Sequence, residues 1–71
     1  MIRQPVASSN LRSIGYEPAS QTLEIEFVAG RVYQYAGVPE HVFRGLMSAN
    51  SHGAYFDSFI RDAGFAFLRI R

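Results

Sequence analysis

The stretch RVYQYAGVPEHVF, residues 31–43, contains the change from extended to helical sequence that decides the fold. Tyr33 and Tyr35 are two residues apart, so in a strand both side chains point to the same face of a sheet. A few residues later, Pro39 suits the first position of a helix and Glu40 suits its first turn. Two aromatic side chains therefore lie close to a helix start, either in the core or on a binding surface.

The segment before this stretch has the pattern of antiparallel strands. Over residues 22–27, TLEIEF alternates apolar and polar side chains, as expected for a half-buried strand. The letters EPAS at 17–20 place turn-forming Pro and Ser between this strand and an earlier one. Residues 10–38 therefore predict a three-stranded antiparallel meander.

The turn at residues 28–30 sets the pairing register of the last two strands. A two-residue turn would require a positive φ angle at Ala29, whereas a three-residue loop requires it only at Gly30. With the three-residue loop, one face of the hairpin carries Leu23, Ile25, Phe27, Tyr33 and Tyr35, and the other carries Thr22, Glu24, Glu26, Val32 and Gln34. We prefer this register because it separates the apolar side chains from the polar ones.

Two short helices are predicted after the meander. In the first, an apolar stripe at helical spacing consists of Val42, Phe43, Leu46 and Met47. The second, AYFDSFIRDA at 54–63, follows a cap at Asn50 or Ser51 and stops at Gly64. Its own stripe consists of Tyr55, Phe56, Phe59 and Ile60.

The tail FAFLRIR, residues 65–71, alternates weakly and indicates a further strand. The expected fold class is therefore α+β, a three-stranded antiparallel meander followed by two short helices packed on one face and a fourth strand, β-β-β-α-α-β. We expect the rings of Tyr33 and Tyr35 to pack against the helices, through Phe43 and Leu46 or through Phe56 and Ile60. Tyr33→Ala is then expected to cost about 3–5 kcal/mol and nearly to unfold the domain.

The composition describes a single small domain over residues 1–71, with residues 1–8 expected to form a flexible lead-in. The chain has no cysteine, so it forms no disulfide. Its net charge of +1 is far from that of a strongly basic nucleic-acid-binding protein, although every basic residue is an arginine. No leader sequence or membrane-spanning run is visible, and we expect a cytoplasmic protein without a membrane partner.

No residue pattern indicates catalysis, a metal site or a cofactor. The acidic residues lie on a strand or on predicted helix surfaces, where nothing draws carboxylates together for acid–base chemistry. His41 and His52 could bind zinc only with a third ligand such as Asp57, and no compact ligand motif links them. The glycines match no phosphate-binding fingerprint. We therefore expect a protein that is not an enzyme and uses no cofactor or metal.

Three motifs in series connect the chain with a known family. They are SSNLRSIGYEPASQTLEIEF at 8–27, G-x-VYQY-x-x-VP at 30–39 and LM-x-A-x-S-x-G-x-YF at 46–56. Together they resemble the KTSC domain family, found at the C-terminus of some lysyl-tRNA synthetases and in small bacterial proteins. The resemblance covers about residues 8–70, and the link to a tRNA synthetase implies a role in RNA binding.

The leading hypothesis is a non-enzymatic binding module for RNA, either tRNA or a single-stranded segment. The candidate contacts are Arg12, Arg31, Arg44, Arg61, Arg69 and Arg71 for phosphates, and Tyr33 and Tyr35 for base stacking. The alternative is a protein-interaction or homodimerisation module with no nucleic-acid role, because FAFLRI offers an edge strand. A third, minor hypothesis is a small-molecule or metal site around His52, Tyr55 and Asp57.

Overall fold

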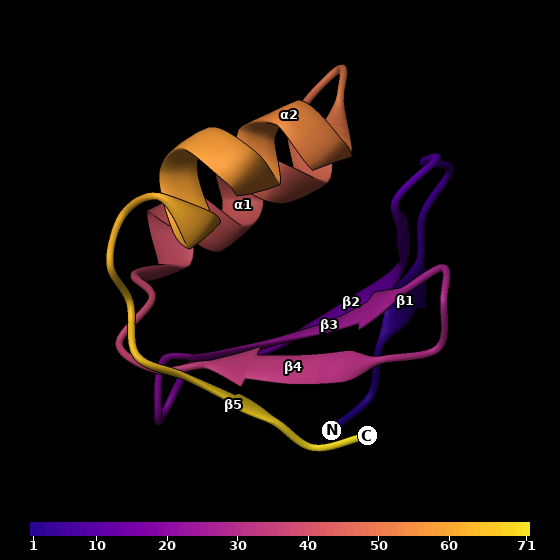
Figure 1. Ribbon diagram of the computed structural model, residues 1–71. Helices are drawn as coiled ribbons and strands as arrows, with labels where there is room; N and C mark the ends of the chain where they lie inside the picture. The colour runs from indigo at the N-terminus through magenta and orange to yellow at the C-terminus, as the bar shows by residue number, and fades with distance from the viewer.

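The computed structural model describes all residues from Met1 to Arg71 and shows the predicted α+β class. Five antiparallel strands form one sheet in the order β1-β2-β3-β4-β5, and the helices lie over one of its faces (Figure 1). The strands are β1 (Gln4–Pro5), β2 (Leu11–Glu17), β3 (Thr22–Phe27), β4 (Val32–Tyr35) and β5 (Phe67–Arg69). The sheet order follows the chain order, and the helices are inserted between β4 and β5.

The prediction of three strands before the helices is wrong by one strand. β1 lies within residues 1–8, the segment predicted as a flexible lead-in, and pairs antiparallel with β2. Gln4 lies opposite Ile14 and Pro5 lies opposite Ser13. A strand of two residues is too short to show an alternating pattern, and its proline, which lacks an N–H, suits a sheet edge. The sequence therefore carried no local signal for it.

The predicted hairpin register between β3 and β4 is confirmed. Leu23 lies opposite Tyr35 and Ile25 lies opposite Tyr33. In the loop, Gly30 has a φ angle of 97°, a left-handed conformation that costs glycine little because it has no Cβ atom. This three-residue loop fixes both tyrosines on the face of the sheet that carries the helices.

The opposite face of the sheet is partly covered by the N-terminal segment. Glu24 is only 5% exposed there. Arg3 Nη1 donates to Glu24 Oε2 at 2.6 Å, and Gln34 Nε2 donates to Glu24 Oε1 at 2.8 Å. A Cβ atom at Gly15 would come within 2.8 Å of the Ile2 carbonyl oxygen, so the chain crosses closely over this position. The carboxylate of Glu24 is thus held in a hydrogen-bonded polar network.

Both predicted helices are present. α1 (Glu40–Ser48) begins after Pro39 and buries Leu46. α2 (His52–Phe56) is capped by Ser51, whose Oγ accepts a hydrogen bond from the Ala54 backbone N–H at 3.2 Å. The cap therefore lies at one of the two positions that the sequence left open.

The second helix departs from the prediction after Phe56. Residues Asp57–Arg61 form a π-helical segment, η1, instead of continuing the α-helix. A π-helix has more residues per turn than an α-helix, so its side chains point in directions that α-helical spacing does not predict. Ile60 is fully buried as expected, but Phe59 is 55% exposed.

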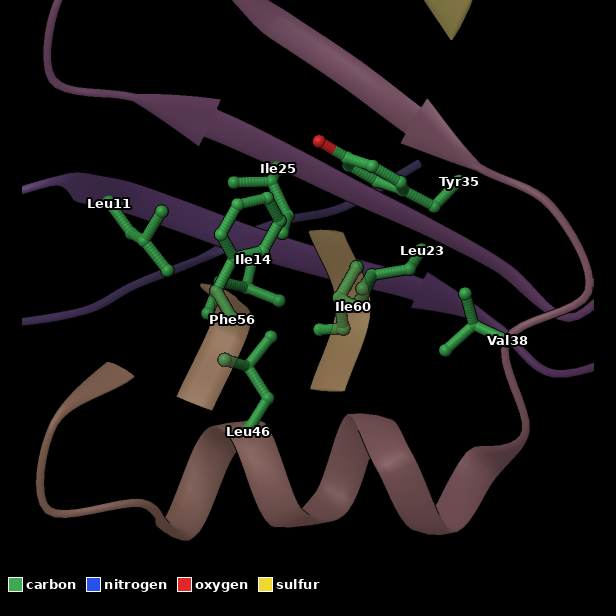
Figure 2. Packing of buried hydrophobic residues seen from close by; sticks show 9 residues of the cluster. All are labelled: Leu11, Ile14, Leu23, Ile25, Tyr35, Val38, Leu46, Phe56 and Ile60. Atoms are coloured by element: carbon green, nitrogen blue, oxygen red, sulfur yellow. The ribbon is translucent and has the colours of Figure 1, made fainter. Parts of the chain in front are cut away.

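The core lies between the sheet and the helices. Figure 2 shows its nine clustered residues, with Leu46, Phe56 and Ile60 pointing from the helical layer toward strand side chains. The strand and loop members are Leu11, Ile14, Leu23, Ile25, Tyr35 and Val38. Tyr35 is therefore part of the core, at 6% exposure, whereas Tyr33 is half-buried and packs against the cluster.

The predicted C-terminal strand is present as β5, which pairs antiparallel with β4 along its outer side (Figure 1). Leu68 lies opposite Gln34 in this pairing. All three residues of β5 are exposed. Neither helix has the length and apolar character that a membrane crossing requires.

Candidate functional site

An open groove of about 660 Å³ lies on the helix-bearing face of the sheet, beside β4 and β5. Five aromatic rings contribute to its walls, from Phe27, Tyr33, Tyr35, Phe56 and Phe67. They come from β3, β4, α2 and β5, so the groove exists only in the folded chain. Its volume falls within the roughly 300–1,000 Å³ of typical ligand sites.

The rings form a continuous contact network. Tyr33 meets Phe27 edge-on at a centroid distance of 5.8 Å and meets Phe67 at 5.9 Å. Tyr35 lies 5.6 Å from Phe56 and 5.8 Å from Phe67. The predicted contact with the helices is therefore confirmed for Tyr35, through Phe56. Tyr33 packs on strand rings instead, so the predicted near-unfolding by Tyr33→Ala is replaced by a smaller expected loss of stability.

The hydroxyl groups of the two tyrosines reach solvent at the groove. No buried side-chain oxygen or nitrogen in the chain lacks a hydrogen-bond partner, and neither Tyr33 nor Tyr35 hydroxyl bonds to another protein group. Tyr16 differs, because its hydroxyl donates to the Val38 carbonyl oxygen at 2.6 Å. The groove thus offers two aromatic rings whose polar ends are free to bond to a ligand or to water.

Burial raises the pKa of Tyr35 to about 12, with a further upward effect from Tyr33 and an opposing one from the Arg61 guanidinium. Because the unfolded side chain ionises near pH 10, the folded state holds the proton more tightly. The stability linked to this proton is therefore complete below about pH 10 and is lost as the pH rises toward 12.

An absorbance titration of tyrosinate checks this shift, since the chain has four tyrosines and no tryptophan. In the folded protein we expect Tyr35→Phe to remove a component that titrates near pH 12. The Tyr35→Phe variant should also lose less stability than the parent as the pH rises above 10. Ionisation of all tyrosines together near pH 10 in the folded chain would contradict the buried environment of Tyr35.

The charged side chains at the groove are Arg31, Arg61 and Asp57. Arg61 Nη1 lies 3.4 Å from Asp57 Oδ1, and its Nε lies 3.4 Å from Asp62 Oδ1. Arg31 is exposed and takes part in none of the ion pairs of the chain. The groove therefore has one unpaired guanidinium and one that is partly neutralised.

The other candidate arginines are dispersed. Arg69 shares the face of Tyr33, because the two residues lie opposite each other in the β4–β5 pairing. Arg71 donates to Glu26 Oε2 at 2.7 Å, and Arg12 Nη2 donates to the Val28 carbonyl oxygen at 3.3 Å. Arg44 forms an exposed pair with Glu40 on α1, next to a different hollow. Four of the candidate residues therefore line the groove: Arg31, Tyr33, Tyr35 and Arg61. Arg69 lies beside them on the same face of the sheet. The groove is not lined by Arg12, Arg44 or Arg71.

The residues of the minor third hypothesis do not form a site. His52, the first residue of α2, has its Nδ1 atom 2.8 Å from the Leu46 carbonyl oxygen of α1. The Tyr55 ring packs on Phe59 at 4.5 Å, while Asp57 faces the groove. No three histidine, aspartate or glutamate side chains are grouped closely enough to hold a metal ion.

Sequence reasoning did not identify Phe27, Phe56 and Phe67 as groove residues. The alternating pattern placed Phe27 on the apolar face, and the helical stripe included Phe56. Their meeting with Phe67 depends on where β5 returns to the sheet, which no local pattern specifies.

The family model of the KTSC domain matches residues 7–65, most of the strands and both helices. The chain belongs to the KTSC domain family. The crystal structure of a KTSC domain protein from Yersinia pestis superimposes with a TM-score of 0.91 at 46% identity, covering 99% of this chain and 97% of that one. The motifs around Tyr33 and Phe56 thus identified the family correctly from sequence.

Two kinds of protein contain sequences related to this KTSC protein. An uncharacterized protein from Stutzerimonas stutzeri is 40% identical over 70 residues, covering 99% of both chains. A lysine–tRNA ligase from Nostoc sp. is 43% identical over 53 residues, which are 75% of this chain but only 9% of the ligase. A ligase from Nostoc punctiforme matches to the same extent. The domain is therefore shared by small proteins and by a short part of these ligases.

Proposed function

We propose that this KTSC domain is a non-enzymatic binding module that holds unpaired RNA bases in its aromatic groove. The observation that carries the proposal is the contact between the half-buried Tyr33 ring and the exposed Phe67 ring in a groove that Arg31 also lines. Single-stranded nucleic acid is commonly bound by aromatic rings that stack on bases and by arginines that contact phosphates. A cytoplasmic location is part of the proposal.

The relatives support this ligand class. Part of this sequence recurs in lysine–tRNA ligases, whose names state that they act on tRNA. Within a tRNA, the unpaired bases of loops and ends are the parts that a stacking groove can reach, because paired bases are already stacked. We therefore propose single-stranded segments, free or within a tRNA, as the ligand.

A titration of fluorescently labelled single-stranded RNA tests the proposal. With two or three phosphate contacts from Arg31, Arg61 and Arg69, raising the salt from about 50 to 200 mM should weaken binding about ten-fold. Arg31→Ala should weaken binding at low salt and make this salt dependence less steep. The absence of any binding at low salt would refute the proposal.

Arg44→Ala is the matched control for Arg31→Ala. It also removes one exposed arginine, but from α1, where the guanidinium pairs with Glu40 away from the groove. If net charge alone attracted RNA, the two variants would lose the same affinity. We expect a clear loss for Arg31→Ala and almost none for Arg44→Ala.

A further inference from the structure

β5 forms one edge of the sheet, and its outer side is unpaired. On its inner side, the Ala66 carbonyl oxygen accepts from the Ala36 N–H, and the Ile70 N–H donates to the Val32 carbonyl oxygen. Because alternate residues of an antiparallel strand bond to the same neighbour, the N–H and C=O groups of Phe67 and Arg69 point outward. These backbone groups can pair with a further strand.

The side chains of β5 are also unusually exposed for apolar residues. Phe67 is 65% exposed and Leu68 is 64% exposed, while Ile70, just beyond the strand, is 46% exposed. The opposite edge, β1, is protected by Pro5, which lacks an N–H. An exposed apolar edge without proline readily recruits another strand.

We propose that β5 pairs antiparallel with β5 of a second copy of the chain, about a two-fold axis through Leu68. This register aligns all three residues of the strand. Phe67 lies opposite Arg69 of the second copy, and Leu68 lies opposite its own equivalent. Since Phe67 and Arg69 both carry outward backbone groups, each Phe67–Arg69 pair forms two hydrogen bonds, and the dimer has one ten-stranded sheet.

The side chains favour this register over those with the two-fold axis at Phe67 or Arg69. It places the Arg69 guanidinium next to the Phe67 ring of the other copy, where a cation–π contact forms. The two leucines meet on the opposite face of the sheet. A two-fold axis through Arg69 would instead place two like charges directly opposite each other, which is destabilising. An axis through Phe67 would pair only one of the three strand residues, Phe67 itself, with a residue of the other β5.

The dimer leaves both grooves accessible. The two-fold axis is perpendicular to the joined sheet, so the groove-bearing faces of both copies lie on the same side. Phe67 lines the groove of each copy, and the two grooves therefore meet at the β5 pair. The pairing itself does not depend on RNA, so its test is independent of the proposed function.

Cysteine cross-linking tests the register directly, because the chain has no cysteine of its own. Two-fold pairing brings the Leu68 Cα atoms to about 4.5 Å, within reach of a disulfide. Leu68→Cys should therefore form a covalent dimer under mild oxidation. Phe67→Cys and Arg69→Cys should each remain monomeric alone and cross-link when mixed. The control is Ile2→Cys, at an even more exposed apolar residue near the other edge.

Sedimentation from micromolar to near-millimolar concentration tests the association without cross-links. We expect a reversible shift from monomer to dimer that Leu68→Glu weakens at least ten-fold, while Ile2→Glu leaves it unchanged. Circular dichroism checks that Leu68→Glu, a change at an exposed residue, remains folded. A monomer at all concentrations would overturn the proposal, as would a dimer insensitive to Leu68→Glu or cross-linking equal to that of Ile2→Cys.

Discussion

Tyr35→Ala is expected to remove most of the stability of the domain at 25 °C. The Tyr35 ring is 6% exposed, belongs to the core cluster and contacts the rings of Phe56 and Phe67. Removing a buried aromatic side chain costs about 3–5 kcal/mol. A domain of this size has a total stability on the order of 5 kcal/mol. Urea denaturation followed by circular dichroism measures the remaining stability.

Tyr35→Phe is the control for this prediction. The Tyr35 hydroxyl has no protein hydrogen-bond partner, so its removal leaves no donor or acceptor unsatisfied. We expect the phenylalanine variant to stay within about 1 kcal/mol of the parent. A Tyr35→Ala protein that melts like the parent would show that the ring does not belong to the core.

Arg3→Ala is expected to cost about 2 kcal/mol, although Arg3 lies in the segment predicted as a flexible lead-in. The Glu24 side chain is 7% exposed and would lose its closest cation, at 2.6 Å. Breaking a buried ion pair on one side costs about 3–5 kcal/mol. We expect less because Arg3 is itself 23% exposed and Gln34 still donates to Glu24. Chemical denaturation measures the loss.

Two further variants test whether the Arg3–Glu24 pair contributes more to stability than an exposed ion pair does. Arg44→Ala breaks the pair with Glu40, whose members are 75% and 47% exposed, and should cost less than about 0.5 kcal/mol. In a Glu24→Gln background the closest carboxylate is gone and Arg3 keeps only the longer contact with Glu26 at 3.8 Å, so Arg3→Ala should cost clearly less than in the parent. Equal losses for Arg3→Ala and Arg44→Ala would mean that the N-terminal segment does not hold Glu24.

The hairpin that positions the site was predictable because its signals are local. Alternation in 22–27 fixes which side chains share a face, and Gly30 permits the loop that sets the register. Both tyrosines were therefore placed on the correct face from sequence. The family was also recognisable, because its motifs are short and lie in a fixed order along the chain.

The parts that escaped prediction depend on contacts between distant residues. β1 is held by pairing with β2 and by the Arg3–Glu24 contact, and neither leaves a periodic pattern in the first residues. The π-helical segment η1 changes the direction of Phe59 without any proline or glycine inside it. The groove gathers Phe27, Tyr33 and Phe67 from three strands, so its shape follows from the sheet order and not from any one stretch of sequence.

The central claim is that the aromatic groove binds unpaired RNA bases, and an NMR titration of labelled protein with a short oligoribonucleotide tests it most directly. We expect the backbone amide signals of Arg31, Tyr33, Arg61 and Phe67 to shift, and those around Arg44 to stay in place. Tyr33→Ala should remain folded and lose about five-fold or more in affinity, because a stacked base contributes about 1–3 kcal/mol. Shifts confined to α1, or unchanged affinity in folded Tyr33→Ala, would contradict the claim.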